Sequence, residues 1–176
     1  PALDRVPLAD VPRIGFPGWP KLTAALAGGI PLGTVLLVHG PPGIGKTTLG
    51  LQLSVSRRMV YASTELTLPM LRQMADRLAL DVAAVVPIYV SRVEEVVAVV
   101  ETVKAPVCVV DAVNGLACDT DGPVLVNVVK ALLRMARERG TAVLAFCHAT
   151  KDDDYAGPRT VEHDVDGLIR LEPDAD

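Results

Sequence analysis

A glycine-rich stretch that ends in a lysine and a threonine is the part of this sequence best suited to chemistry. Residues 40–47 read Gly-Pro-Pro-Gly-Ile-Gly-Lys-Thr and match the pattern G-x-x-x-x-G-K-[ST]. Glycines let the backbone turn so that successive N–H groups can bind phosphate oxygens, and the lysine brings positive charge to the terminal phosphates. The hydroxyl of Thr47 is a suitable ligand for Mg²⁺. We therefore expect ATP to be bound by Gly40, Pro41, Pro42, Gly43, Ile44, Gly45, Lys46, Thr47 and Thr48.

The residues on either side of this motif favour a phosphate-binding loop over a chance match. The apolar run 35–38 predicts a strand before the glycines, and residues 46–57 predict a helix after them. The positive end of the helix dipole would then lie where the phosphates bind. A glycine-rich turn that matched the pattern by chance would need neither flank.

Three side chains follow predicted strands and are candidates for catalysis or metal binding. Asp111 ends the apolar run 107–110 and is expected to hold Mg²⁺ with Thr47, the alternative being a strand-end or helix-capping aspartate. Glu65 follows the strand 59–62, where it could orient or deprotonate the water that attacks the terminal phosphate; a solvated loop glutamate is the alternative. His148 follows the strand 141–147 and could contact the same phosphate, although a lone histidine there is often structural. Lys46, Glu65 and His148 are the candidate catalytic residues.

Alternating strand and helix patterns predict the scaffold that positions these residues. Further strands are expected near 87–90 and 165–171, and helices over 68–80, 93–103 and 124–139. This alternation predicts an α/β fold with a doubly wound, mainly parallel sheet, in which ligands bind at the carboxyl ends of the strands. Residues 1–33 are expected to form an irregular lead-in packed on the core, with one short helix over 21–27. Residues 34–176 are expected to form the core of a single domain.

Composition predicts a cytoplasmic protein without a membrane span. Half of the 176 residues are hydrophobic, yet no apolar run approaches the roughly 18 residues that a membrane helix needs. Valine-rich strands buried on both faces explain the apolar surplus better. The first residues lack the pattern of a signal peptide, and three scattered cysteines favour a reducing compartment over a disulfide framework.

Several segments together resemble the bacterial RadA (Sms) family of RecA-like ATPases. The similar segments are 12–14, 26–34, 40–47, 61–65, 108–111 and, most specifically, 148–152 with 156–166, which follows that family's G-H-x-T-K and A-G-P-[KR]-x-x-E-H-x-V-D pattern. The resemblance implies a RecA-like P-loop fold and ATP hydrolysis in DNA repair and recombination. It also implies that Glu65 is the catalytic glutamate, that His148 senses the γ-phosphate, and that residues 152–162 form a DNA-facing loop.

The sequence departs from that family in ways that bear on assembly. RadA proteins carry an N-terminal four-cysteine zinc module, a C-terminal protease-like domain and a K-N-R-F-G motif, and none of these occurs in the 176 residues. Cys147 replaces the glycine before the sensor histidine, and Leu66 replaces a second acidic residue after Glu65. We therefore expect a minimal RecA-like core that associates weakly with copies of itself and hydrolyses ATP slowly.

Charge argues against the DNA binding that the resemblance implies. The formal net charge is −4, and the loop 112–123 contains two aspartates and no lysine or arginine. The loop expected after His148 contains two basic residues, Lys151 and Arg159, and four acidic ones. Tyr155 is its only aromatic residue available for stacking. Phosphate contacts from basic side chains supply most non-specific affinity, so single-stranded DNA is a disfavoured partner. The alternative function is a nucleotide-sensing regulatory module that binds ATP, hydrolyses little and binds no DNA.

Overall fold

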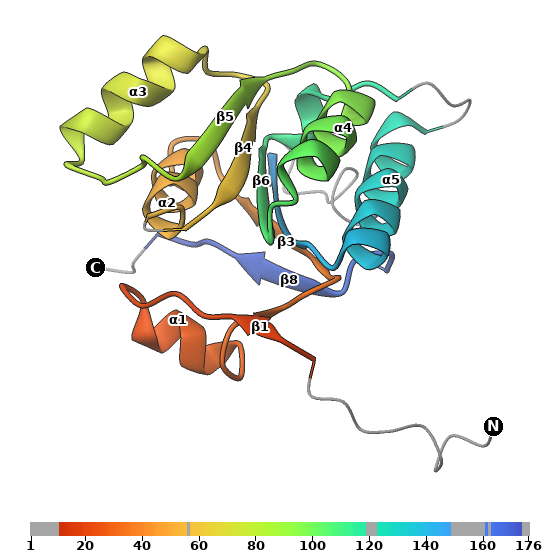
Figure 1. The fold of residues 1–176 in the computed structure, drawn as a ribbon, viewed down its shortest axis with the longest axis horizontal. Coiled ribbons are helices and arrows are strands. Elements are labelled where there is room, and N and C mark those ends of the chain that lie inside the picture. Colours follow the sequence, from red (N-terminus) through yellow and green to blue (C-terminus); the bar gives the residue numbers. More distant parts are fainter. Residues whose placement is uncertain (1–10, 56, 119–122, 149–160, 162, 174–176) are drawn as a thin grey trace.

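A six-stranded parallel sheet forms the centre of the computed structural model (Figure 1). The structure describes residues 11–55, 57–118, 123–148, 161 and 163–173. The strand order is β5-β4-β6-β7-β3-β8, and every neighbouring pair is parallel. These strands are β3 (Val35–Gly40), β4 (Met59–Ser63), β5 (Val85–Tyr89), β6 (Val107–Asp111), β7 (Ala142–His148) and β8 (Gly167–Arg170). The predicted α/β fold with a parallel sheet is confirmed.

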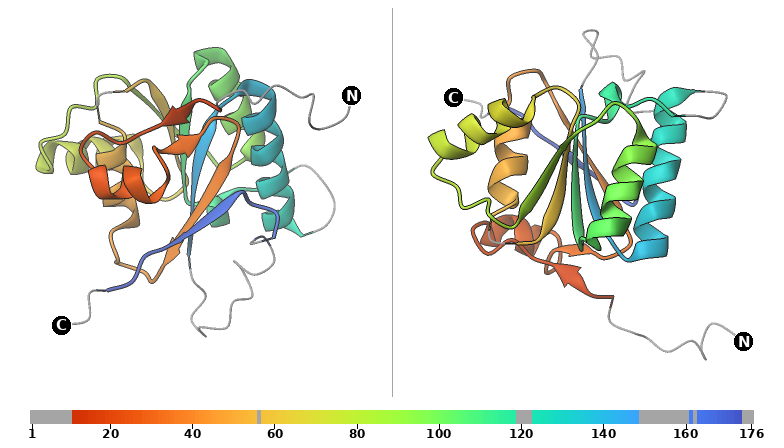
Figure 2. Two further views of the ribbon diagram at one scale, coloured as in Figure 1. Left: turned by 90° about the horizontal axis from the view of Figure 1, so that it is seen from below. Right: turned by 45° about the horizontal axis from the view of Figure 1, so that its top comes forward.

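Helices cover both faces of the sheet (Figure 2). On one face lie α2 (Lys46–Leu53) and α3 (Leu68–Arg77), and on the other lie α4 (Val93–Val103) and α5 (Val124–Arg139). Apolar side chains alternate between these two faces along each central strand, so each strand is buried from both sides. Within the described residues, no helix has the length and apolar character that crossing a membrane requires.

Strand order brings the carboxyl ends of four strands together. Because β4, β6, β7 and β3 are consecutive in the sheet and parallel, the segments that follow them meet along one edge. The register pairs Ser63 with Asp111, Asp111 with Phe146, and Gly40 with His148. In α/β proteins, a crevice forms at the strand ends where the connections from two adjacent strands leave in opposite directions along the sheet. Ligands bind in that crevice.

The N-terminal segment is more regular than a simple lead-in. Strand β1 (Arg13–Ile14) pairs antiparallel with β2 (Ile30–Pro31), and α1 (Pro20–Ala25) lies between them in sequence. Phe16 is buried in the core on the α2 side of the sheet. Arg57 donates a hydrogen bond to the Gly15 carbonyl at 2.6 Å and lies 5.4 Å from the centre of the Phe16 ring. These contacts fasten the segment to the core, and they were not predicted because they join residues far apart in sequence.

Most element boundaries lie within about three residues of the sequence pattern, and that of α2 differs most. Helix α5 spans residues 124–139 as predicted and ends at Gly140, whose φ of 62° is left-handed. Helix α2 was predicted to continue to Arg57 but ends at Leu53. There the Ser54 hydroxyl donates to the Gly50 carbonyl at 2.6 Å, which is the local side-chain hydrogen bonding by which serine competes with helical structure.

Candidate functional site

The loop between β3 and α2 has the backbone conformation of a phosphate-binding cradle. Gly43 and Gly45 have φ angles of 80° and 96°, a left-handed region that residues with a side chain rarely adopt. Gly40 is required for space, since a Cβ there would lie 2.8 Å from the carbonyl oxygen of Leu171. Thr47 and Thr48 follow in the first turn of α2 and are half-buried. This loop therefore fits the phosphates of a nucleotide, with its glycines at positions that need them.

The ammonium group of Lys46 is held at the loop. Lys46 is only 6% exposed, and its Nζ donates to the carbonyl oxygens of Gly40 at 2.8 Å and Pro41 at 3.1 Å. Burial lowers its pKa, and the negative charges of Asp111 and Glu65 oppose this effect. The Lys46 ammonium group therefore interacts electrostatically with both candidate carboxylates, and from the same position it can bind a phosphate.

Asp111 ends β6 with its carboxylate nearly buried. Its exposure is 4%, and its Oδ2 accepts a hydrogen bond from the hydroxyl of Tyr61 at 2.8 Å. Residues 107, 109 and 111 alternate with residues that face α4 and α5, so Asp111 lies on the α2 side of the sheet, where the phosphate-binding loop also lies. Sequence reasoning identified Asp111 but not Tyr61, which looked like an ordinary core residue of a buried strand.

Glu65 and His148 come into direct contact. The imidazole Nε2 of His148 lies against Oε1 of Glu65, although 83 positions separate them in sequence. The backbone N–H of His148 donates to Oδ1 of Asn114 at 2.9 Å, and Asn114 belongs to the short 3₁₀ helix η2 (Val113–Gly115) after β6. Sequence reasoning proposed both Glu65 and His148 for the same phosphate, and it missed Asn114.

A second set of contacts joins the turn after β4 to the turn after β6. Thr64 Oγ1 donates to the carbonyl oxygen of Ala112 at 3.0 Å and accepts from the Ala112 N–H at 3.0 Å. The Thr64 N–H donates to the Asp111 carbonyl oxygen at 2.8 Å. A Cβ on Gly115 would lie 2.3 Å from Thr64 Oγ1, so that glycine makes room for the contact. The residue just before Glu65 is therefore hydrogen-bonded directly to the backbone of Asp111 and Ala112.

The oxygen ligands present suit Mg²⁺ that is shared with phosphate groups. The described residues contain no cluster of three or more His, Cys, Asp or Glu side chains that could hold a metal ion alone. Thr47 and Asp111 offer a hydroxyl and a carboxylate, the hard oxygen ligands that Mg²⁺ takes beside phosphates. These two residues fit the cation only as part of a nucleotide complex.

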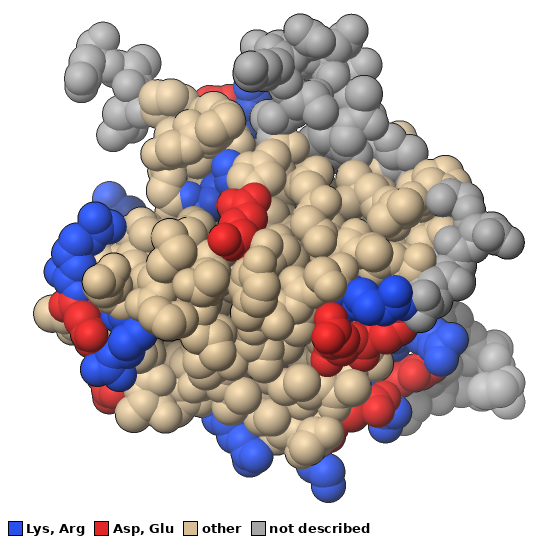
Figure 3. Space-filling view, turned by 90° about the horizontal axis from the view of Figure 1, so that it is seen from above, with Lys and Arg blue, Asp and Glu red and all other residues tan. Residues whose placement is uncertain are grey.

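Several residues from the sequence analysis lie outside the described part of the chain. Lys151, Tyr155 and Arg159 are among them, as are the two aspartates of the segment 112–123, Asp119 and Asp121. Figure 3 shows the side towards which β4 and β5 run. Over the described residues in that view, acidic and basic side chains are interspersed and form no broad basic area.

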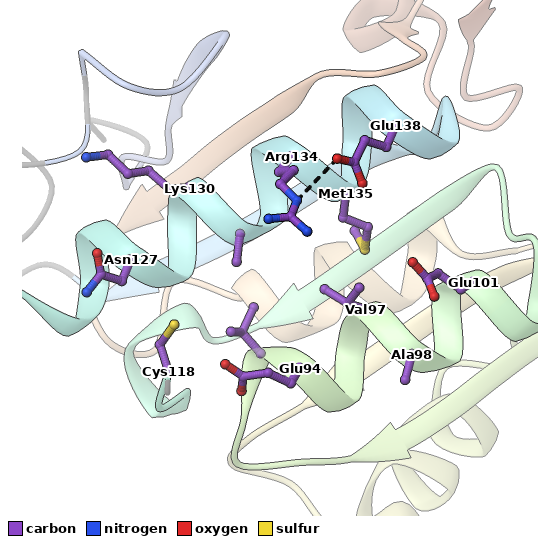
Figure 4. Close-up of a pocket in the computed structure, with 12 residues that line it drawn as sticks. Glu94, Val97, Ala98, Glu101, Cys118, Asn127, Lys130, Arg134, Met135 and Glu138 are labelled. Carbon is purple, nitrogen blue, oxygen red and sulfur yellow. Dashed lines mark ion pairs between the residues drawn. The ribbon is translucent and has the colours of Figure 1, made fainter. Parts of the chain in front are cut away.

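A hollow lies on the face of the sheet opposite to the glycine-rich loop and α2. It lies between α4 and α5, has a volume of about 570 Å³ and is drawn in Figure 4. The Arg134–Glu138 ion pair lies along α5 at this hollow, and Glu94 and Glu101 approach it from α4. Acidic and basic groups line it together, which does not suit a triphosphate.

Comparison with known proteins agrees with the fold and with the resemblance to RadA. The chain is 35% identical to the DNA repair protein RadA of Brucella abortus over 94% of its own length and 38% of that protein, and 30% identical to RadA of Escherichia coli over 99% and 40%. It therefore spans about two fifths of the length of these relatives.

Solved structures with low sequence identity share the fold. A flagellar accessory protein FlaH from Methanocaldococcus jannaschii superposes with a TM-score of 0.68 at 16% identity, covering 85% of this chain and 76% of that one. A KaiC-like protein from Pyrococcus horikoshii gives a TM-score of 0.68 at 21% identity, covering 92% and 81%, and the RadB recombinase gives 0.59 at 22%, covering 85% and 79%. The fold is RecA-like, and residues 17–176 match the family of unknown function DUF7125, to which this chain belongs.

Proposed function

We propose that this chain binds ATP with Mg²⁺ and hydrolyses it as a RecA-like ATPase related to RadA. The observation that carries the proposal is the meeting of four strand ends at one edge of the sheet. These strand ends contribute the glycine-rich loop that contains Lys46, the carboxylate of Asp111, and the contact between Glu65 and His148. A chance glycine-rich turn would have no reason to lie beside these groups.

Each of these residues has a separate task in phosphoryl transfer. Lys46 would place positive charge at the terminal phosphates as negative charge shifts onto the leaving oxygen. Glu65 would orient the attacking water and accept its proton. Thr47 and Asp111 would hold Mg²⁺, whose charge screens the phosphate oxygens when it is bound. His148 would sense the γ-phosphate through its contact with Glu65.

The biological setting in this proposal is DNA repair and recombination, on the strength of the similarity to RadA. A homo-oligomer is the natural assembly for such a core, with weak association in isolation. Direct binding of single-stranded DNA is disfavoured by the net charge of −4. A protein partner or an oligomeric ring would then have to bring the chain to DNA.

A nucleotide-sensing module with little hydrolysis is the second candidate. The contact between Glu65 and His148 favours it, because the imidazole occupies one carboxylate oxygen of Glu65 that would otherwise be available to the attacking water. In that case ATP binding would change the state of the chain without rapid turnover. The two candidates share the same nucleotide site and differ only in the rate of the chemical step.

Calorimetric titration with ATP and Mg²⁺, followed by steady-state phosphate release, tests the proposal. The Lys46→Ala variant should lose about tenfold or more in ATP affinity, because it lacks the cation aimed at the terminal phosphates. Lys21→Ala is a matched control on the exposed α1 helix. Equal affinity in the Lys46 variant and the unaltered chain would overturn the site. Tight binding with negligible turnover would favour the sensing module.

A further inference from the structure

Tyr61 is a core residue whose one polar atom reaches the nucleotide site. Its side chain is fully buried in β4, in the apolar cluster that includes Leu51 and Leu71. A phenylalanine would fill the same space, and a buried hydroxyl is unfavourable unless it is hydrogen-bonded. The hydroxyl donates to Asp111 Oδ2 at 2.8 Å, so its partner is the candidate Mg²⁺ ligand itself.

The sheet register explains why this contact needs a tyrosine. Tyr61 lies beside Val109 on the neighbouring strand, while Asp111 lies beside Ser63, two residues further along. Two residues of a strand span about 6.6 Å, so a donor at position 61 must reach diagonally towards the strand end. A serine or threonine hydroxyl is too close to the backbone to do so, whereas a phenol spans the gap.

Helix α2 leaves room for this hydroxyl. A Cβ on Gly50 would lie 3.1 Å from the Tyr61 hydroxyl oxygen and 2.9 Å from Cε2 of Phe146. Glycine in the interior of a helix is less favourable than alanine, so its presence here is best explained by close packing against both Phe146 and Tyr61. The hydroxyl is therefore enclosed between the α2 backbone and Asp111.

The hydroxyl is the donor in this hydrogen bond, because an ionised carboxylate can only accept. A donor at Oδ2 restricts the rotation of the carboxylate, and so favours one orientation of Oδ1.

We propose that Tyr61 is a positioning residue that holds the Asp111 carboxylate in the orientation required for Mg²⁺ beside the phosphates. This role rests on the proposed function, because it concerns the same nucleotide complex. It goes beyond that function by assigning a task to a residue of the core. Tyr61 itself touches neither phosphate nor water in this role.

The test is Tyr61→Phe, which keeps the ring and removes only the hydroxyl. Binding of a fluorescent ATP analogue is titrated with Mg²⁺ and, separately, in EDTA. We expect the Mg²⁺ concentration for half-maximal binding to rise about five- to tenfold, and the affinity in EDTA to stay unchanged, since a hydrogen bond to a charged group is lost and the loop is intact. Tyr89→Phe, at an exposed position at the end of β5, is the matched control and should behave as the parent.

A second variant separates positioning from simple destabilisation. In the Asp111→Asn background, removing the Tyr61 hydroxyl should cause no further change in the Mg²⁺ requirement, because the two residues act as a unit. Parental Mg²⁺ dependence in Tyr61→Phe would overturn the positioning role while leaving the nucleotide site in place. Failure of the unaltered chain to bind the analogue would instead overturn the proposed function, and this role with it.

Discussion

His148 and Glu65 touch across the end of a strand that separates them. His148 closes β7 and Glu65 follows β4, and these strands are not neighbours because β6 lies between them. The contact of Nε2 with Oε1 therefore passes over the end of β6, where Asp111 lies. Asn114 binds the His148 N–H and Thr64 binds Ala112, so both partners are tied to the chain just after β6. The three strand ends form one connected unit.

Glu65 and Asp111 are expected to contribute to different steps. Glu65→Gln keeps a hydrogen-bonding side chain at the same place but removes the base, so turnover should fall by about 10²-fold or more with ATP affinity nearly unchanged. Asp111→Asn should weaken Mg²⁺-dependent binding as well, because it removes a charged ligand. Parallel measurement of phosphate release and of ATP affinity distinguishes these outcomes. A Glu65→Gln variant that turns over at the parental rate would make Glu65 a solvated loop residue.

Asn114 is expected to act on turnover through His148. Its Oδ1 accepts the backbone N–H of His148 at 2.9 Å, and Asn114→Ala removes that acceptor. Losing this hydrogen bond, together with the one that the Asn114 side chain makes with Cys147, should lower kcat about fivefold with little change in ATP affinity. Asn114→Asp retains the acceptor oxygen and should restore most of the rate.

The control for this prediction is a double-variant cycle. In a His148→Ala background, Asn114→Ala should lower kcat no further, because the imidazole that Asn114 positions through the backbone is already gone. Additive losses in the double variant would mean that Asn114 acts independently of His148.

Local patterns predicted the scaffold and much of the site. The candidate phosphate-binding loop could be predicted because its glycines, Lys46 and Thr47 are contiguous, and the candidate metal ligand Asp111 because an apolar strand runs directly into it. Helices α4 and α5 agreed with their apolar periodicity from first to last residue. In each case the information lies within one element and its immediate neighbours.

The relationships between elements could not be predicted in the same way. The contact of Glu65 with His148 depends on the order β4-β6-β7, which periodicity does not reveal. Tyr61 looked like a core residue because its hydroxyl partner lies on another strand, 50 positions away. The pairing of β1 with β2 likewise depends on a turn of the chain around α1. Each missed feature joins residues that are distant in sequence.

Gly140 offers a test of the fold that leaves the nucleotide site untouched. It ends α5 at a φ of 62°, and a Cβ there would meet no atom within 4 Å, so only its backbone conformation matters. Gly140→Ala should lower the free energy of unfolding by about 1 kcal/mol, because alanine disfavours left-handed backbone. Lys104→Gly is the matched variant, since Lys104 ends α4 at a φ of 52° and glycine there relieves strain. Urea denaturation should show a loss for the first variant and no loss for the second.

The three thiols should differ sharply in reactivity. Burial raises the pKa of Cys108 to about 12, and burial also raises the pKa of Cys147, so both stay protonated and shielded near neutral pH. Cys118 is only partly buried. Alkylation of the native chain at pH 8, read by mass spectrometry, should therefore modify Cys118 first. Denaturant should abolish the difference, and early labelling of Cys108 would contradict the buried position of β6.

The isolated chain should bind single-stranded DNA only weakly. The net charge of −4 and the acidic residues in the segments 112–123 and 149–162 oppose contact with phosphates, so the affinity at physiological salt should be no better than about micromolar. Fluorescence anisotropy with a labelled oligonucleotide at two salt concentrations measures this, and sedimentation with ATP and Mg²⁺ reports the oligomeric state of the same sample. Submicromolar binding that weakens steeply with salt would reveal a basic surface, with Lys151 and Arg159 the first residues to replace. If that binding appears only in samples that sediment as a ring, the basic surface is formed by several copies together, because each copy adds its few cations around one pore.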